Sequence, residues 1–159
     1  MTHDLTQASA AHLSRLYARG KASPVETMKA VLARTDEVNP RINCFRQVDH
    51  EASLKAARES EKRWKKGKPL SPIDGVPVSI KELVRVKGWP ATMASKLTDK
   101  TPADADAPAV ARLREAGTIV FAHSTSSEYG HKGGTDSPLN RSEEHTSELQ
   151  SHLNLVCRL

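Results

Sequence analysis

The feature that most constrains the fold is a short apolar strand that ends in a lysine. Residues 73–81 read Ile-Asp-Gly-Val-Pro-Val-Ser-Ile-Lys, and a loop with two prolines leads into them. A second apolar stretch, at 118–122, follows a predicted helix at 106–117 that has Asp106 as its cap and Gly117 as its end. The order strand, helix, strand predicts an α/β fold, with a parallel or mixed sheet flanked by helices.

Three further helices are expected before this strand. An apolar stripe from Leu5 predicts a helix that ends at Gly20, and Ser23-Pro24-Val25-Glu26 forms a capping box for a second helix that stops at Asn39-Pro40. Residues 42–48 have strand character, and Asp49 caps a third helix that runs to Gly67. Residues 87–106 lack periodicity and predict a long surface connection, a kind of segment that is often functional.

Charge gives little support for a nucleic-acid partner. The chain has 24 Lys and Arg against 19 Asp and Glu, and residues 1–140 keep a net charge of +6. Much of the excess lies in residues 62–68, which fit the solvated end of a helix. Trp64 is the only aromatic residue there, whereas a nucleic-acid surface needs basic residues spread over a face with aromatic side chains for stacking.

Cysteine content and hydropathy favour a cytoplasmic protein. Outside residues 141–159 the only cysteine is Cys44, so no internal disulfide can form, which agrees with a reducing compartment. The N-terminus does not resemble a signal peptide, and no stretch approaches the roughly twenty apolar residues of a membrane span.

No metal or cofactor site is expected from the motifs. His50-Glu51 begins like a metalloprotease helix, but Leu54 stands where the second histidine would be. His123 and His131 lack further ligands beside them. The glycines at 130, 133 and 134 have neither the lysine ending of a phosphate loop nor the spacing of a dinucleotide motif.

Lys81 is the candidate catalytic residue. At the end of an apolar strand we expect it to be buried, and burial disfavours the charged form of a lysine, so that it can act as a base near neutral pH. The competing interpretation is a lysine that reaches solvent at a strand end. Ser124, Ser126 and Ser127 are weaker candidates for a nucleophile, because serines after a strand more often form turns and helix caps.

The chain resembles the amidase-signature family of serine hydrolases. The resemblance rests on the Gly-Val-Pro-x-x-Ile-Lys run that ends at Lys81, on residues 88–92 and 106–121, and on Glu128-Tyr129-Gly130 and residues 135–140. Two positions depart from the usual family pattern, which commonly has Gly-Lys-Thr-Asn at residues 122–125 and an aspartate at Glu82. These departures leave the subfamily and the substrate open.

The resemblance implies amide hydrolysis by a serine, serine, lysine triad. Lys81 would take a proton through a bridging serine from the nucleophilic serine, and backbone amides of a Gly/Ser-rich loop would stabilise the oxyanion. The family motif that carries that loop and both serines does not occur in this sequence, so we expect a truncated, N-terminal part of the fold that is inactive by itself. The alternatives are part of the amidase subunit of a tRNA-dependent amidotransferase, or a binding module without catalysis.

The last segment is expected to be foreign to the fold. Residues 141–159 resemble the in-frame translation of a sequencing adapter, so we divide the chain into a family segment, 1–140, and a tail, 141–159, whose apolar side chains should make few contacts with the rest. Truncation should leave apolar faces or edges of residues 76–80 and 118–122 open to solvent and favour self-association.

Overall fold

The structure, a computed structural model, describes residues 4–132, 134, 135, 137 and 139. The tail at 141–159 and the contacts predicted for it lie outside the described residues. The described elements are α1 (Ala10–Ala18), α2 (Pro24–Ile42), β1 (Phe45–Val48), α3 (His50–Lys65), β2 (Pro77–Lys81), α4 (Pro108–Glu115), β3 (Ile119–Ser124) and a short 3-10 turn, η1 (Glu128–Gly130).

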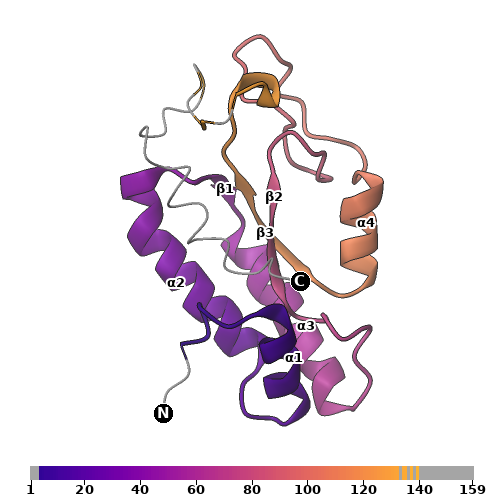
Figure 1. The fold of residues 1–159 in the computed structure, drawn as a ribbon. Helices are drawn as coiled ribbons and strands as arrows, with labels where there is room; N and C mark the ends of the chain where they lie inside the picture. Colours follow the sequence, from indigo (N-terminus) through magenta and orange to yellow (C-terminus); the bar gives the residue numbers. More distant parts are fainter. Residues whose placement is uncertain (1–3, 133, 136, 138, 140–159) are drawn as a thin grey trace.

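A mixed sheet lies at the centre, in the order β1-β3-β2 (Figure 1). β2 and β3 run parallel, and Lys81 pairs with Ser124 in their register. β1 runs antiparallel to β3. The predicted mixed α/β sheet is confirmed, and the parallel pair brings the ends of β2 and β3 to the same edge.

Helices cover the two faces of the sheet from opposite sides (Figure 1). On one face, α2 and α3 pack on β1 and β3 around Met28, Val31, Phe45 and Phe121. On the other face, α4 and the segment after β2 pack on the alternate side chains of β2 and β3; this cluster consists of Val78, Ile80, Val86, Trp89, Val110 and Val120. The two clusters follow the period of two along the strands except at Phe121 and Ala122, which both lie in the first cluster where the register of β2 and β3 shifts.

The helix boundaries differ from the sequence prediction in three places. α1 begins at Ala10, because the Ser9 side chain caps it by accepting a hydrogen bond from the amide of His12. α2 continues past Pro40 to Ile42 and closes on Asn43, a residue type that tolerates its left-handed conformation at φ 48°. Asp106 does not cap α4; it accepts a hydrogen bond from the amide of Lys87 and pairs with Arg114 instead.

Of the open apolar faces or edges predicted for the strands, the open faces are not found, whereas an open edge is. All five side chains of residues 118–122 are buried, and in residues 76–80 only Ser79 is exposed. The reason is that α4 and the long connection after β2 fold back over these strands, which the sequence pattern did not reveal. Within the described residues β2 remains an edge strand.

A buried ion pair fixes the entry into β2. Both oxygens of the fully buried Asp74 carboxylate accept hydrogen bonds from Arg63 of α3, at 2.7 and 2.6 Å, and the amide of Leu70 adds a third. Burial acts to raise the pKa of Asp74, but these hydrogen bonds and the Arg63 charge hold it below its usual value. Gly117 closes the contact, because a Cβ there would lie 2.6 Å from the Asp74 carboxylate.

We predict that Arg63→Met destabilises the chain by about 3 kcal/mol, because it leaves the buried Asp74 carboxylate without its cation. Chemical denaturation at neutral pH measures the change. Arg58→Met is the matched control, since Arg58 is exposed on the same helix and should change stability by less than about 0.5 kcal/mol. Equal losses in the two variants would contradict the prediction.

Candidate active site at the strand exits

Lys81 stands at the end of β2, and its neighbours come from the segment after β3. Gly130 in η1 lies close to its amine, since a Cβ at Gly130 would lie 3.8 Å from the Lys81 Nζ. Gly130 has a φ of 70°, so it combines a left-handed conformation with a close approach. The side chain of Leu83 also packs against Gly130, at 2.6 Å from the same Cβ position.

The predicted burial of Lys81 is wrong for this structure, in which its side chain is exposed. Ser79 and Lys81 point to the sheet face that α2 and α3 cover, but the apolar cluster on that face is built from α2, α3, β1 and β3. The edge strand β2 therefore has its lysine on an uncovered part of the face. The competing interpretation, a lysine that reaches solvent at a strand end, describes the observed environment.

The residue after Lys81 is buried instead. Glu82 is fully buried, and its carboxylate accepts hydrogen bonds from two other segments and forms an ion pair with a third. Oε1 accepts a hydrogen bond from the Ser126 amide at 2.9 Å, and Oε2 accepts one from the Thr92 hydroxyl at 3.0 Å. Arg46 of β1 forms an ion pair with Oε2 at 3.2 Å. Glu82 therefore links β1, the exits of β2 and β3, and the long connection after β2.

The long connection and η1 meet in a strained contact beside this carboxylate. The amide of Tyr129 donates to the Met93 carbonyl at 2.8 Å. Met93, Ala94 and Tyr129 all have positive φ values, between 50° and 54°, which non-glycine residues rarely adopt. Such conformations concentrate at functional sites, where surrounding contacts maintain them.

His123 is buried next to the Glu82 and Arg46 pair. Its ring stacks edge-on against Trp89 at a centroid distance of 4.7 Å, and within the described residues neither ring nitrogen has a well-aligned hydrogen bond. The pKa of His123 is lowered to about 4, first because burial disfavours the charged ring and second because the Arg46 charge lies near; the backbone of Val84 opposes this only in part.

The serines after β3 take structural roles. The Ser126 hydroxyl donates to the Ser127 carbonyl at 3.1 Å, and the Ser127 hydroxyl donates to the Lys132 carbonyl at 3.2 Å. Ser127 is also the residue before η1. These contacts agree with the interpretation as turn residues, whereas the Ser127 side chain makes no capping hydrogen bond to η1.

The sequence analysis missed Arg46, Glu82, Thr92 and His123 as parts of this site. A signal was present for Glu82, because a carboxylate directly after an apolar strand is costly unless it is paired. For Arg46 and Thr92 no local signal exists, since both reach Glu82 only through the antiparallel pairing of β1 and the return of the long connection.

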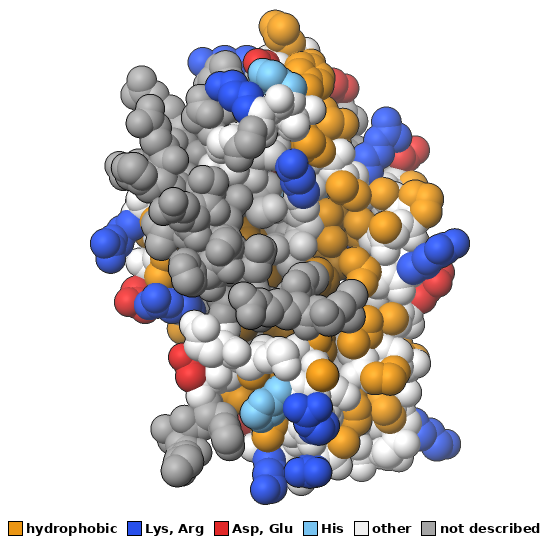
Figure 2. All heavy atoms as spheres, viewed as in Figure 1, with side chains coloured by type: hydrophobic (Ala, Val, Ile, Leu, Met, Phe, Trp, Pro, Cys, Tyr) orange, Lys and Arg blue, Asp and Glu red, His pale blue; other side chains and the backbone are white. Residues whose placement is uncertain are grey.

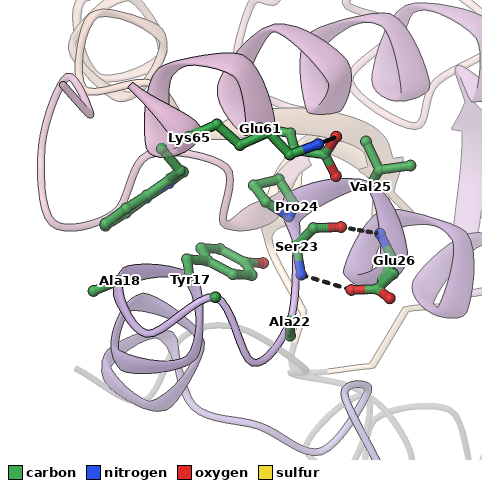
Figure 3. A pocket seen from close by; sticks show the side chains of 11 residues that line it. Tyr17, Ala18, Ala22, Ser23, Pro24, Val25, Glu26, Glu61 and Lys65 are labelled. Atoms are coloured by element: carbon green, nitrogen blue, oxygen red, sulfur yellow. Dashed lines mark hydrogen bonds and ion pairs between the residues drawn. The ribbon is translucent and has the colours of Figure 1, made fainter. Parts of the chain in front are cut away.

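Other parts of the described chain offer weaker candidates for a functional site. Residues 4–132 and the described positions beyond them contain no group of three His, Cys, Asp or Glu that could hold a metal, and His50 pairs with Asp36. A hollow of about 440 Å³ lies where α1, the start of α2 and the end of α3 meet (Figure 3). Its polar groups satisfy one another, because Glu26 accepts from the Ser23 amide and Glu61 pairs with Lys65, so it is structural.

The face drawn in Figure 2 shows no basic stripe among the described residues. On the face in Figure 2, Lys and Arg side chains are scattered around the outline and do not gather over one element. None of the described helices is both long enough and apolar enough to cross a membrane.

We predict that acid destabilises the chain through His123. Between about pH 6.5 and 4 the unfolded chain binds a proton on this ring while the folded chain does not, so stability falls as the pH falls through that window. Wild type should lose about 2 kcal/mol more than His123→Leu over this range, measured by denaturation at each pH. The exposed His131→Leu should keep the wild-type profile; parallel profiles for all three proteins would contradict the assignment.

Comparison with known proteins identifies the group to which the chain belongs. The Amidase family model matches residues 26–145. A glutamyl-tRNA(Gln) amidotransferase subunit of Salinispora tropica is 41% identical over 143 residues, with 85% of this chain and 29% of the relative aligned. An acylamidase of Rhodococcus erythropolis is 37% identical over 131 residues, which cover 82% of this chain and 28% of the relative.

Solved structures agree with this assignment. A structure described as an amidase superposes with a TM-score of 0.73 at 28% identity, over 83% of this chain and 31% of the other. The chain thus spans less than a third of the length of these relatives. Because the family model matches most of the chain, and the motifs around Lys81 lie within the match, the chain belongs to the amidase family, the amidase-signature group that its sequence resembles.

Proposed function

We propose that this chain is the lysine-bearing part of an enzyme that hydrolyses carboxylic amides, and that Lys81 is its proton acceptor. The observation that carries the proposal is the position of Lys81 at the shared exit of two parallel strands, within the segment matched by the Amidase family. Active-site residues in open α/β sheets gather at this edge. By family resemblance, the nucleophilic and bridging serines would come from outside this sequence, and the chain alone would be inactive.

The exposure of Lys81 is consistent with a site in which this chain supplies the lysine and a further segment supplies the serines. A base of this kind requires loss of solvent around the amine, because burial favours the neutral form. The face of β2 that carries Ser79 and Lys81 is uncovered, so we place the remaining part of the enzyme on that face. There it would bring the serines to Lys81 and remove water from it in the same step.

Substitutions of Lys81 test the proposal in a longer protein that joins residues 1–140 to the segments with both serines. Lys81→Ala should reduce turnover of a simple aromatic or aliphatic amide by at least 10²- to 10⁴-fold, the contribution typical of a general base. Lys81→Arg should fail almost as badly, because a guanidinium does not lose its proton in a protein.

The control is Lys87→Ala, which removes an exposed lysine close in the sequence and should leave turnover within about twofold. Circular dichroism of each variant checks the fold. If the arginine variant retained most of the activity, Lys81 would have an electrostatic or structural role, and its assignment as proton acceptor would be withdrawn.

The second candidate function is the amidase subunit of a tRNA-dependent amidotransferase. It is favoured by the Salinispora relative, whose name is that of a glutamyl-tRNA(Gln) amidotransferase component. In this case the longer protein would act together with at least one further subunit in a tRNA-dependent amidotransferase, whereas a free-standing amidase would hydrolyse simple amides alone. A non-catalytic binding module would do neither.

We place the protein in the cytoplasm, where the buried, unpaired Cys44 would remain reduced.

For the chain by itself we propose self-association through exposed apolar side chains. Leu97, 88% exposed, and Tyr129, 57% exposed, both belong to the segments that meet at the Met93 carbonyl. The sedimentation coefficient should rise with concentration for wild type and less for Leu97→Lys, with the exposed Leu70→Lys as control. A wild-type chain that stays monomeric at all concentrations would contradict the proposal.

A further inference from the structure

We propose that Glu82 is a positioning residue, which holds the lysine-bearing end of β2 against the turn that contains Gly130; this inference rests on the proposed role of Lys81. Glu82 itself does not face the reaction space, because its side chain is fully buried while that of Lys81 is exposed. Its effect would pass through the residues that it binds.

The carboxylate fixes both strand exits at once. The amide of Glu82 donates to the Ser124 carbonyl at 3.1 Å and extends the pairing of β2 with β3 by one residue. The side chain then reaches over to the other strand exit and accepts from the Ser126 amide at 2.9 Å. One residue therefore sets the spacing between the backbone beside Lys81 and the backbone that enters η1.

Ser126 is connected to the surroundings of Lys81 through the short turn η1. The Gly130 amide donates to the Ser127 carbonyl at 2.9 Å and closes η1 directly after Ser126. Thr92, the second donor to Glu82, precedes Met93, whose carbonyl accepts from the Tyr129 amide. The turn is therefore held by hydrogen bonds to two segments that Glu82 binds, and Gly130 is the part of it next to the Lys81 Nζ.

The charge of Glu82 matters as well as its shape. Ser126 and Thr92 donate hydrogen bonds to the same carboxylate, and Arg46 forms an ion pair with it and supplies the compensating positive charge. A glutamine has nearly the same size but would direct its NH₂ group toward at least one of these donors and leave Arg46 without its counter-ion. Glu82→Gln therefore removes the constraint without opening a cavity.

Hydrogen exchange on the 159-residue chain tests whether Glu82 orders the turn η1. In Glu82→Gln, the Tyr129 and Gly130 amides should exchange at least about tenfold faster, because the hydrogen bonds that order the turn depend on segments that Glu82 binds. Amides of α3, such as that of Ala57, should change far less. Glu115→Gln, an exposed glutamate at the end of α4, is the matched control and should leave all these rates unchanged.

Thr92→Val provides a milder second variant, because it removes one donor and keeps the charge pair. It should accelerate exchange at Tyr129 and Gly130 by a smaller factor. If Glu82→Gln does not fold, the exchange rates of this variant test the proposal instead. Unchanged rates at Tyr129 and Gly130, or an equal acceleration at all amides of the chain, would overturn the proposal in favour of a general stabilising role.

Kinetics in the longer protein described above test the link to Lys81. There Glu82→Gln should lower kcat at least about tenfold with KM within about twofold, because the turn is misplaced while substrate contacts remain; Glu82→Asp, which keeps the charge, should recover part of the loss. An unchanged kcat would overturn the positioning role. If wild type itself did not hydrolyse amides, the proposed function would fail, whereas the exchange rates would still show whether Glu82 orders the turn.

Discussion

The arrangement of the site depends on the buried pair of Asp74 and Arg63. This pair joins α3 to the turn before β2, and the tight fit of Gly117 against Asp74 brings the start of β3 to the same point. The Gly75 amide donates to the Gly117 carbonyl there, so the two strands begin side by side. Parallel strands that begin together and have similar lengths also end together, which places the residues after both at one edge.

At that edge Glu82 connects the ends of β2 and β3, as Asp74 connects their starts. Both carboxylates are fully buried, both pair with an arginine from another element, and both accept a hydrogen bond from a backbone amide of a loop. Buried charges of this kind are costly unless every oxygen has a partner. β2 is thus anchored at each end by a charge pair, with Lys81 at its last position.

The environment of Lys81 shows how much of the proposed active site one sheet edge can supply. β2 and η1 fix the backbone around the amine, but the face of β2 on which the amine lies is uncovered. Two separate things are therefore required of the lysine, its position and the removal of water around it. Hydrogen bonds and backbone geometry of this chain fix its position, and we propose that further parts of the enzyme remove the water.

The sequence by itself determined what depends on local chemistry. The capping box at Ser23, the Asp49 cap, the strand that ends at Lys81 and the mixed sheet could all be predicted, because capping and hydrophobic period act over a few residues. The family motif at Lys81 also lies within one continuous run. By contrast, the burial of Glu82, its union with Arg46 and Thr92, and the exposure of Lys81 depend on which segments return to the edge of β2. Only the tertiary structure decided these, because burial and pairing are set by contacts between residues distant in the sequence.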